Sequence, residues 1–350
     1  MPFSIAFYVH HHGSGHLMRT LQIASALGGR KIFLMGSALD KISIKLPEHI
    51  ELIHLPADTP HRGDLQAPHE RVPDIFHYAP TGVSGVTERT AIMTDLFKRE
   101  FPIMLIVDVS VEVTLLARLC SVPTIVMLQH GIRNDLPHLM AYQSAALLLA
   151  PYPSSLYVGE KNWVFNKTVF TGGFSRFNSN SDAQKEHNKN IAVLIGAGGS
   201  SINNELIDKI AREASTYTFH ILGNETSGDA SFNIFWHGQV QDPQQILEKC
   251  RIVIGNTGHN TVMEVASLDK RFIGIPEERP FAEQVQKALS IEKRKGVRII
   301  PPLKLRKQHW EAIFNKLSEE VPDWEGIINP GAIGKMAREI ICMGNRLFGV

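Results

Sequence analysis

The stretch Ile252-Val-Ile-Gly-Asn-Thr-Gly-His-Asn-Thr-Val-Met-Glu264 carries the clearest structural signal in the chain. An apolar run opens it, a polar turn with a glycine follows, and residues 261–268 then place Val262, Val265 and Ala266 on one helical face. The pattern predicts a buried strand, a loop and the start of a helix. Unpaired backbone N–H groups at such a helix start, together with the positive end of the helix dipole, form a site for phosphate.

Glu264 lies about one turn inside this predicted helix. A carboxylate at that place can accept hydrogen bonds from a vicinal diol such as ribose. Phosphate and ribose together suggest a nucleotide ligand. An ordinary capped helix without a ligand is the alternative interpretation of the same residues.

Length and composition set the broad class of protein. The chain has 350 residues, more than one hydrophobic core usually holds, so we expect two domains. A hydrophobic fraction of 43% is ordinary for a soluble globular protein. A net charge of +1, without a long stripe of lysine and arginine, argues against nucleic acid as a partner.

Three cysteines, Cys120, Cys250 and Cys342, stand apart without a Cys-x-x-Cys spacing. This argues against a disulfide framework and a structural zinc site, and a reducing cytoplasm fits it best. Residues 3–9 lack the features of a signal peptide and are interpreted as the first buried strand. No apolar run approaches the roughly 18 residues of a membrane span, so we expect a cytoplasmic protein and leave peripheral contact with the inner face of a membrane open.

Short apolar runs alternate with helical patterns along the chain. In the first half they cover residues 5–9, 31–35, 50–55, 104–107, 124–128 and 146–150. After a polar interruption they cover residues 191–195, 218–222, 234–236, 252–254, 271–275 and 297–300. Such alternation predicts an α/β fold with two Rossmann-like, doubly wound domains, each a parallel sheet covered by helices.

We therefore expect four segments. They are an N-terminal domain at residues 1–170, a hinge and polar linker at 171–190, a second domain at 191–329, and a C-terminal helix at 330–350. Ligands of open α/β sheets bind beyond the carboxyl ends of the strands, so two such domains that face each other form one cleft.

Residues 256–264, followed by Pro280-Phe-Ala-Glu-Gln284, resemble the nucleotide-sugar signature of GT-B glycosyltransferases. The similarity is to plant UDP-glycosyltransferases and to the bacterial N-acetylglucosaminyltransferase that forms lipid II. It implies the GT-B fold, with an N-terminal acceptor domain, a C-terminal nucleotide-sugar domain and a last helix that crosses back to the first domain. One departure is Asn256, which stands where the plant enzymes have a phosphate-contacting histidine and which adds no positive charge.

The resemblance also assigns donor-binding residues. The family positions that match residue by residue are Gly258, Asn260, Thr261 and Glu264. The implied diphosphate loop comprises Thr257, Gly258, His259, Asn260 and Thr261. Glu264 would hold the ribose, and Glu283 and Gln284 would hold hydroxyl groups of the donor sugar.

A second glycine loop follows the strand predicted at residues 191–195. It resembles the Gly-Gly-Ser loop of lipid-II-forming transferases, which implies that Gly198, Gly199 and Ser200 lie against the donor nucleotide. Gln239 and Val240 follow a later strand, where the family supplies contacts to the base. Trp236, just before them, is expected to be a core residue rather than a base-stacking one.

The first strand ends in His10-His-His-Gly-Ser-Gly-His-Leu-Met-Arg19, where a helix begins. Its glycines allow a ligand to approach the backbone closely, but the spacing is not the dinucleotide fingerprint. The pattern Gly-x-Gly-His, two residues, Arg resembles the first-strand loop of bacterial GT-B transferases, which faces the acceptor. Here that loop comprises Gly13, Ser14 and Gly15.

His16 is the candidate general base, because histidine titrates near neutral pH and can take a proton from a hydroxyl group. Asp108 directly follows the strand predicted at residues 104–107 and resembles the aspartate that pairs with the base in plant glucosyltransferases. It would hold the imidazole tautomer and stabilise the imidazolium that forms. The alternative is that Asp108 caps the next helix and that His16 binds a donor phosphate.

Other residues are assigned to the cleft by position alone. His130 ends another first-domain strand and is expected to open on the cleft. Residues 77–80 and Arg89 lie in a poorly patterned segment, where such folds place acceptor loops. Arg176, in the hinge segment, is interpreted either as a cleft residue or as an ordinary surface arginine.

We expect no metal and no cofactor beyond the nucleotide-sugar co-substrate. His10 and His12 could converge on one face of a strand, but no acidic residue in that loop completes a ligand set. A paired-carboxylate motif is not evident near the donor loops either.

These residues predict a glycosyltransferase that moves a sugar from a UDP-linked donor to an acceptor hydroxyl group, with inversion and without metal. The first alternative is a nucleotide-sugar hydrolase or 2-epimerase of the same twin-domain shape. The second is a non-catalytic binder of a nucleotide sugar or glycan. The sequence leaves the sugar and the acceptor open, and glycan, lipid-linked and small-molecule acceptors all fit.

Overall fold

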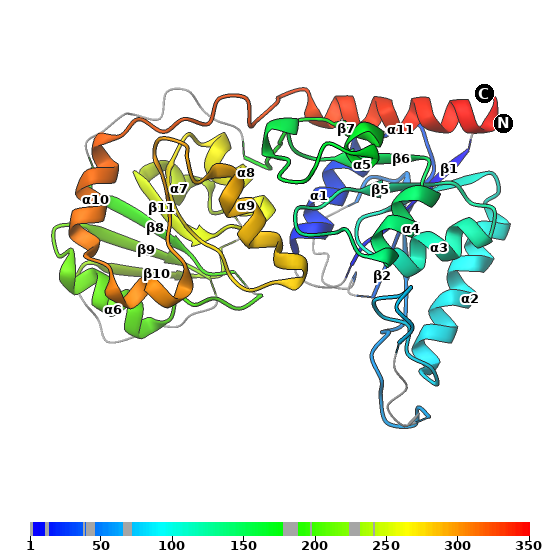
Figure 1. Cartoon of the computed structure of the whole chain (residues 1–350), viewed down its shortest axis with the longest axis horizontal. Coiled ribbons are helices and arrows are strands. Elements are labelled where there is room, and N and C mark those ends of the chain that lie inside the picture. Colours follow the sequence, from blue (N-terminus) through cyan, green and yellow to red (C-terminus); the bar gives the residue numbers. More distant parts are fainter. Residues whose placement is uncertain are drawn as a thin grey trace.

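The computed structural model of the chain describes residues 3–10, 14–37, 39, 46–65, 72–177, 188–196, 198–223, 232–240 and 242–350. Over these residues the chain forms two lobes that lie side by side (Figure 1). Each lobe contains one parallel sheet, so the predicted α/β architecture with two Rossmann-like halves is confirmed.

The first sheet and its helices are called the N-terminal lobe, and its strand order is β3-β2-β1-β4-β5-β6-β7. Its strands are β1 (Ser4–Tyr8), β2 (Ile32–Gly36), β3 (Ile50–His54), β4 (Ile103–Val107), β5 (Thr124–Met127), β6 (Leu147–Ala150) and β7 (Thr168–Phe170). Its helices are α1 (Ser14–Ser25), α2 (Ser84–Arg99), α3 (Val111–Leu119), α4 (Leu136–Ser144) and α5 (Trp163–Lys167), with the short turn η2 (Ser154–Leu156). Strand β7 was not expected, because three residues carry little periodicity.

The second sheet and its helices are called the C-terminal lobe, with the strand order β10-β9-β8-β11-β12-β13. Its strands are β8 (Asn190–Leu194), β9 (Thr218–Leu222), β10 (Ile234–Gly238), β11 (Ile252–Asn256), β12 (Arg271–Ile275) and β13 (Val297–Ile299). Its helices are α6 (Asn204–Glu213), α7 (Gln244–Lys249), α8 (His259–Ser267), α9 (Glu283–Ile291) and α10 (Trp310–Glu319), with the turns η3 (Pro280–Ala282) and η4 (Pro302–Lys307). Residues 178–187 of the predicted hinge and polar linker lie outside the described residues.

The central strands are buried on both faces, because helices cover both sides of each sheet. Ile5 on β1, Phe33 on β2 and Leu105 on β4 are all 0% exposed. In the C-terminal lobe, Ile191 and Ile252 are equally inaccessible. This burial explains why these strands are continuous apolar runs and not alternating patterns.

The strand order places two sets of loops at the sites where such sheets bind ligands. The order reverses between β1 and β4 in the N-terminal lobe and between β8 and β11 in the C-terminal lobe. In open α/β sheets, ligands bind beyond the carboxyl ends of strands at such switch points. The loop after β1 leads to His16, Asp108 follows β4, and the glycine loop and the start of α8 follow β8 and β11.

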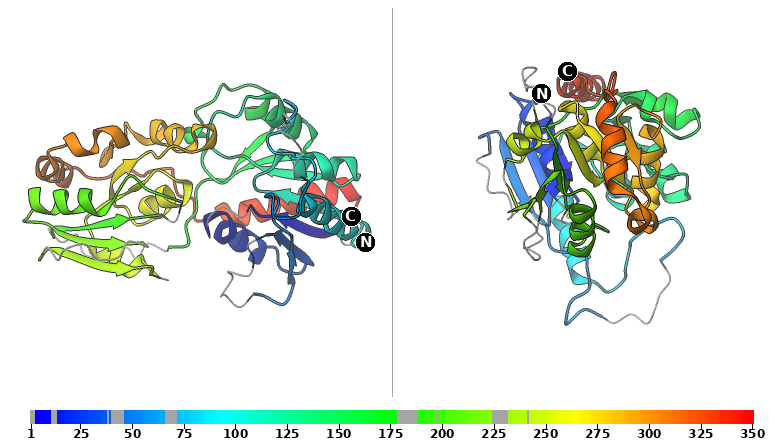
Figure 2. Two further views of the ribbon diagram at one scale, coloured as in Figure 1. Left: turned by 90° about the horizontal axis from the view of Figure 1, so that it is seen from below. Right: turned by 90° about the vertical axis from the view of Figure 1, so that its left-hand side faces the viewer.

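Helix α11 (Ala332–Phe348) packs on the N-terminal lobe and not on the lobe that precedes it in the chain (Figure 2). Its buried side chains, Ala332, Met336 and Ile340, join the core formed by β1 and α1. The two segments that cross between the lobes lie side by side. The N–H of Gly173 donates to the Ile327 carbonyl at 2.8 Å, and the N–H of Asn329 donates to the Gly173 carbonyl at 2.8 Å.

No helix in the part of the chain that the structure describes combines the length and the apolar character needed to cross a bilayer.

A cluster of basic groups, buried at Lys287 and His130 and half-buried at His259, lies where the lobes meet. Lys287 on α9 is 1% exposed, and its Nζ lies 5.2 Å from the centre of the Tyr152 ring. Among the residues that the structure describes, Nζ has no hydrogen-bond partner. Burial lowers the pKa of Lys287 to about 7, and Glu283 only partly opposes this. Burial and the nearby Lys287 also hold the pKa values of His130 and His259 well below their usual range.

The packing of α11 can be tested at Gly344, which faces Phe3. A Cβ atom at Gly344 would lie 2.0 Å from Cζ of Phe3. Alanine is the better helix former, but overpacking costs about 1–3 kcal/mol. We expect Gly344→Ala to lower the free energy of unfolding by about 1–2 kcal/mol in chemical denaturation. Gly334→Ala, on an exposed part of the same helix, should be neutral or stabilising, and equal losses in the two variants would contradict this packing.

The buried amine of Lys287 should make stability depend on pH. Lysine in an unfolded chain has a pKa near 10.4, so between about pH 7 and pH 10 the unfolded state binds more protons than the folded state. The free energy of unfolding should therefore rise with pH across that interval. We expect Lys287→Met to be more stable than the wild type at about pH 7 and to lose most of this advantage by about pH 10.

Denaturant titrations across that interval measure the effect. Lys293→Met replaces an exposed lysine near the end of the same helix and should leave the pH slope unchanged. A wild-type slope that survives in Lys287→Met would show that another group causes it.

Candidate functional site

The predicted pair His16 and Asp108 is brought together at the switch point of the first sheet. Nδ1 of His16 lies 2.5 Å from Oδ2 of Asp108. Arg19 donates from Nη2 to Oδ1 of the same carboxylate, and Gln129 donates to that oxygen at 3.0 Å. Asp108 is 3% exposed, so its charge is buried and paired on both oxygens. The alternative that Asp108 caps α3 is wrong, because Ser110 caps that helix and accepts from the Val113 N–H.

The charges around Asp108 decide the state of the pair. Burial alone would raise the pKa of the Asp108 carboxyl, but the Arg19 guanidinium and the His16 ring outweigh burial and hold that pKa well below its usual range. A carboxylate only accepts hydrogen bonds, so the proton of a neutral His16 ring lies on Nδ1. The lone pair then lies on Nε2, the atom that would take a proton from a substrate.

The start of α8 faces the start of α1 across the lobes. Asn260 donates from Nδ2 to the carbonyl of Gly15 at 3.1 Å. Gly258 is the N-cap of α8 and provides no side chain to pair with the first N–H groups of the helix. Ser14 opens α1 in the same region, while Gly13 lies outside the described residues. The structure thus brings predicted acceptor-side and donor-side loops together.

Asn256 and Thr257 organise the donor loop from within. Oδ1 of Asn256 accepts from the Gly258 N–H at 2.9 Å and from the hydroxyl group of Thr261 at 3.3 Å. Thr257 is fully buried, and its hydroxyl donates to the Gln284 carbonyl at 2.7 Å. These side chains shape the loop, so a ligand at the helix start would meet mainly backbone N–H groups.

Glu264 lies on α8 and forms an ion pair with Arg176, with Nε and Oε1 2.9 Å apart. Burial raises the pKa of Glu264, and Arg176 opposes that rise. Arg176 therefore contacts the residue assigned to the ribose, while its side chain, 36% exposed, also lies at the surface. One carboxylate oxygen of Glu264 is already engaged by this pair.

Glu283 and Gln284 open α9, beside the loop after β12. Gln284 is 7% exposed, and its Oε1 accepts from the Glu277 N–H at 3.0 Å. Glu283 lies 3.5 Å from Nη2 of Arg133, which belongs to the other lobe. Gln284 is thus fixed by the backbone, and Glu283 by a contact between lobes.

The second glycine loop is tied to residues that sequence reasoning missed. Arg279 donates to the carbonyls of Gly198 and Gly199 at 2.7 and 2.8 Å. The Glu277 carboxylate accepts from the N–H of Ser201 at 2.6 Å and from the Ser200 hydroxyl at 3.3 Å. An anion at this loop would therefore compete with Glu277 for the Ser201 amide.

The end of β10 carries the remaining donor assignments. Gln239 is exposed, and Val240 is half-buried against the core. Trp236 packs at the margin of the C-terminal core, as expected for a structural residue.

A small cavity of about 50 Å³ lies beside Asp108. His77, Arg133, His138 and Phe281 contribute to its lining, so part of the predicted acceptor segment does reach the site. Arg89 does not, because it is 4% exposed and donates to the Tyr8 hydroxyl at 2.8 Å inside the N-terminal lobe.

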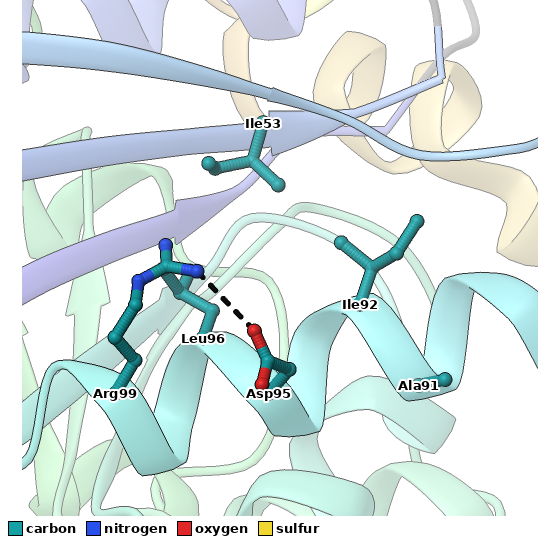
Figure 3. A pocket seen from close by; sticks show the side chains of 6 residues that line it. All are labelled: Ile53, Ala91, Ile92, Asp95, Leu96 and Arg99. Atoms are coloured by element: carbon teal, nitrogen blue, oxygen red, sulfur yellow. Dashed lines mark hydrogen bonds and ion pairs between the residues drawn. The ribbon is translucent and has the colours of Figure 1, made fainter.

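A wider groove of about 350 Å³ is remote from this site. It lies between β3 and α2, where Ile53 faces Ile92 and Leu96 while Asp95 pairs with Arg99 on the helix (Figure 3). Its lining is apolar apart from that pair, so it offers no group for acid–base chemistry.

His77, Asp135 and His138 form a cluster whose ligand atoms lie within 4.8 Å of one another. Hydrogen bonds within the protein account for this cluster. Asp135 caps α4, and its carboxylate accepts from the rings of His77 and His138 at 2.8 Å each. Arg133 donates to Nε2 of His138 at 2.9 Å, which fixes the His138 proton on Nδ1, and its charge opposes a cation. His10 and His12 are the other pair considered for a metal. The ring centre of His10 lies 6.5 Å from that of His16, and His12 lies outside the described residues.

Arg19 and Gln129 are functional candidates that were not assigned from the sequence. Arg19 stands three residues after His16, a spacing that brings side chains onto the same helix face, so the motif itself carried that signal. Gln129 directly precedes His130 at the end of a predicted strand, and only its contact with Asp108 distinguishes it from a loop residue.

Comparison with known proteins bears on both lobes. Residues 190–321 match the model of the glycosyltransferase family 28 C-terminal domain. No curated protein matches the chain by sequence.

Solved structures match over nearly the whole chain. MurG of Acinetobacter baumannii has a TM-score of 0.65 and 14% identity, covering 98% of this chain and 100% of that one. A UDP-glucosyltransferase of Polygonum tinctorium capable of glucosylating indoxyl has a TM-score of 0.66 and 14% identity, covering 98% of each chain. The spinosyn rhamnosyltransferase SpnG, complexed with thymidine diphosphate, has a TM-score of 0.63 and 14% identity, covering 97% of this chain and 96% of that one.

At such low identity these structures establish the shared fold, and the matched family model adds the class of enzyme. The family 28 domain in the C-terminal lobe, on a chain built from two facing Rossmann-like lobes, identifies the protein as a glycosyltransferase with the GT-B fold.

Proposed function

We propose that the chain transfers a sugar from a UDP-linked donor to an acceptor hydroxyl group, with inversion at the anomeric carbon and without a metal ion. The observation that carries the proposal is the Asp108-held His16 beside the start of α8, where Asn260 contacts Gly15. A candidate base and a helix start suited to a diphosphate thus lie on opposite sides of one seam.

The proposed reaction uses these groups in one displacement. Nε2 of His16 takes the proton of the acceptor hydroxyl, whose oxygen forms a bond to the anomeric carbon. The bond from that carbon to the diphosphate oxygen breaks on the opposite face, and the nucleoside diphosphate leaves. Asp108 stabilises the imidazolium that forms. Backbone N–H groups and the dipole of α8 stabilise the departing charge, so the proposal needs neither a metal nor a further cofactor.

The choice of donor rests on Glu264 and on related structures. Glu264 would accept ribose hydroxyl groups while retaining its contact with Arg176. Similar solved structures include complexes with UDP and with thymidine diphosphate. We propose UDP as the nucleotide, and a hydroxyl group of a glycan, a small molecule or a lipid-linked acceptor at a membrane surface as the nucleophile.

A thermal-shift screen of UDP, thymidine diphosphate and their common sugar conjugates tests the donor. A ligand at 100 times its Kd should stabilise the protein by about 2.7 kcal/mol. The absence of any shift would argue against nucleotide-sugar binding. A separate assay without an acceptor tests the alternative enzyme class, because release of free sugar there would favour the nucleotide-sugar hydrolase.

Donor binding should depend on Glu264. Glu264→Ala removes the proposed hydrogen bonds to ribose and should weaken UDP binding by about 1.5–3 kcal/mol, measured by titration calorimetry. Arg176→Gln is the matched control, since it breaks the same ion pair but leaves the carboxylate in place. If the two variants bind UDP equally, the carboxylate does not contact the nucleotide.

Turnover should depend on His16 more than donor binding does. His16→Ala should lower kcat by about 10²–10⁴-fold and leave the Kd of UDP near the wild-type value. Initial rates are measured in excess EDTA, so that retained wild-type activity also tests the metal-free part of the proposal. A large loss of UDP affinity with little loss of kcat would make His16 a phosphate ligand.

A further inference from the structure

The loop before α9 contains two strained residues. Phe281 has φ 58° and ψ 22°, and Ala282 has φ 53° and ψ 32°. Residues other than glycine rarely adopt this left-handed conformation, because it is strained when a Cβ atom is present. Such residues persist only where their surroundings hold them. The next two residues are Glu283 and Gln284, which the proposed function assigns to the donor sugar.

The contacts that hold this loop come from the other lobe. The Ile132 N–H donates to the Phe281 carbonyl at 2.7 Å. The Phe281 ring packs against His77 and His138, with ring centres 4.9 and 4.6 Å away. The Arg133 guanidinium lies 4.8 Å from the centre of the same ring.

Gly131 allows this close approach. It has φ +118°, and a Cβ atom there would lie 2.7 Å from the Phe281 carbonyl oxygen. Arg133 extends the contact to Glu283, with Nη2 and Oε2 3.5 Å apart. Its side chain is 8% exposed, and that of Glu283 is 27% exposed, so the pair is largely shielded from solvent. Arg133 also donates to the His130 carbonyl at 3.0 Å, which fixes its position on the N-terminal lobe.

We propose that residues 131–133 of the N-terminal lobe are a positioning element of the donor-sugar site. They hold Phe281 and Ala282 in the left-handed conformation and thereby set Glu283 and Gln284 for the sugar. The nucleotide contact at Glu264 needs no such element. This inference rests on the proposed function and predicts that sugar recognition, unlike nucleotide recognition, requires the two lobes to be docked at this loop.

The experiment compares complete donors with the nucleotide alone. The Kd values of UDP, UDP-glucose and UDP-N-acetylglucosamine are measured by calorimetry for the wild type and for Gly131→Ala. We expect the variant to bind UDP within about twofold of the wild type. Its preference for the better of the two sugar conjugates over UDP should fall about tenfold, a usual size for coupling between sites.

A matched control separates contact from backbone strain. Gly63 also has a positive φ, +109°, but a Cβ atom there would meet nothing within 4 Å. Gly63→Ala should therefore leave the preference unchanged. Because Gly131→Ala places its Cβ against backbone and could fail to fold, Arg133→Met supplies a second test that removes the contacts to Phe281 and Glu283. An unchanged preference in a folded Gly131→Ala or Arg133→Met protein would overturn the inference, as would equal losses for UDP and its conjugates.

Hydrogen exchange distinguishes failure of this inference from failure of the proposed function. In the full chain without ligand, the amide of Ile132 and the peptide covering residues 278–284 should exchange at least tenfold faster in Gly131→Ala than in Gly63→Ala. Unchanged exchange would overturn the docking. If the wild type binds none of the three nucleotides, the UDP proposal fails, and exchange alone then decides whether residues 131–133 hold the loop.

Discussion

The buried carboxylate of Asp108 is the interaction on which the site depends. A buried charge is costly unless it is paired and hydrogen-bonded, and here the partners come from α1 and from the end of β5. His16 and Arg19 thus fix the first turns of α1 against the sheet, while Gln129 joins the next strand to the same anion. The Asp108 carboxylate therefore has two effects: it orients the candidate base His16, and it holds α1 and the end of β5 together at the switch point of the sheet. Arg19 has a second effect, because it keeps Asp108 ionised and so preserves the hydrogen bond that leaves the lone pair of a neutral His16 ring on Nε2.

The seam between the lobes combines positive helix ends with basic side chains whose pKa values are lowered. The starts of α1 and α8 meet where Asn260 contacts Gly15, so two dipoles present their positive ends to the same region. Lys287, His130 and His259 lie nearby, and their lowered pKa values reduce the repulsion that full protonation would bring. A region of this kind favours an anionic group, which supports the proposed place of the diphosphate.

Periodicity and short motifs predicted the two sheets and the pairing of His16 with Asp108, because each depends on residues that are local in sequence or that end neighbouring strands. The sequence could not predict that Gln284 is fixed by the Glu277 N–H, or that Glu277 binds the glycine loop, because those contacts depend on how two loops fold over each other. The sequence around Arg89 lacks a clear pattern and therefore predicts an acceptor loop there. In the structure it lies on α2 and is buried against Tyr8. The partnership of Phe281 with Arg133 joins segments about 150 residues apart, and no local pattern encodes the left-handed backbone that accompanies it.

The side-by-side crossings at Gly173 and Asn329 make the C-terminal lobe an insertion within the N-terminal lobe, since β1 and α11 both belong to the latter. Two neighbouring connections act as one hinge, which permits the lobes to rotate but opposes their sliding past each other. Opening by such rotation would separate the contacts far from the hinge more than those beside it. The same topology gives the molecule a place for recombination. The entry to and exit from the inserted lobe are held together by two backbone hydrogen bonds, so a different lobe could be inserted there without rerouting the chain of the first.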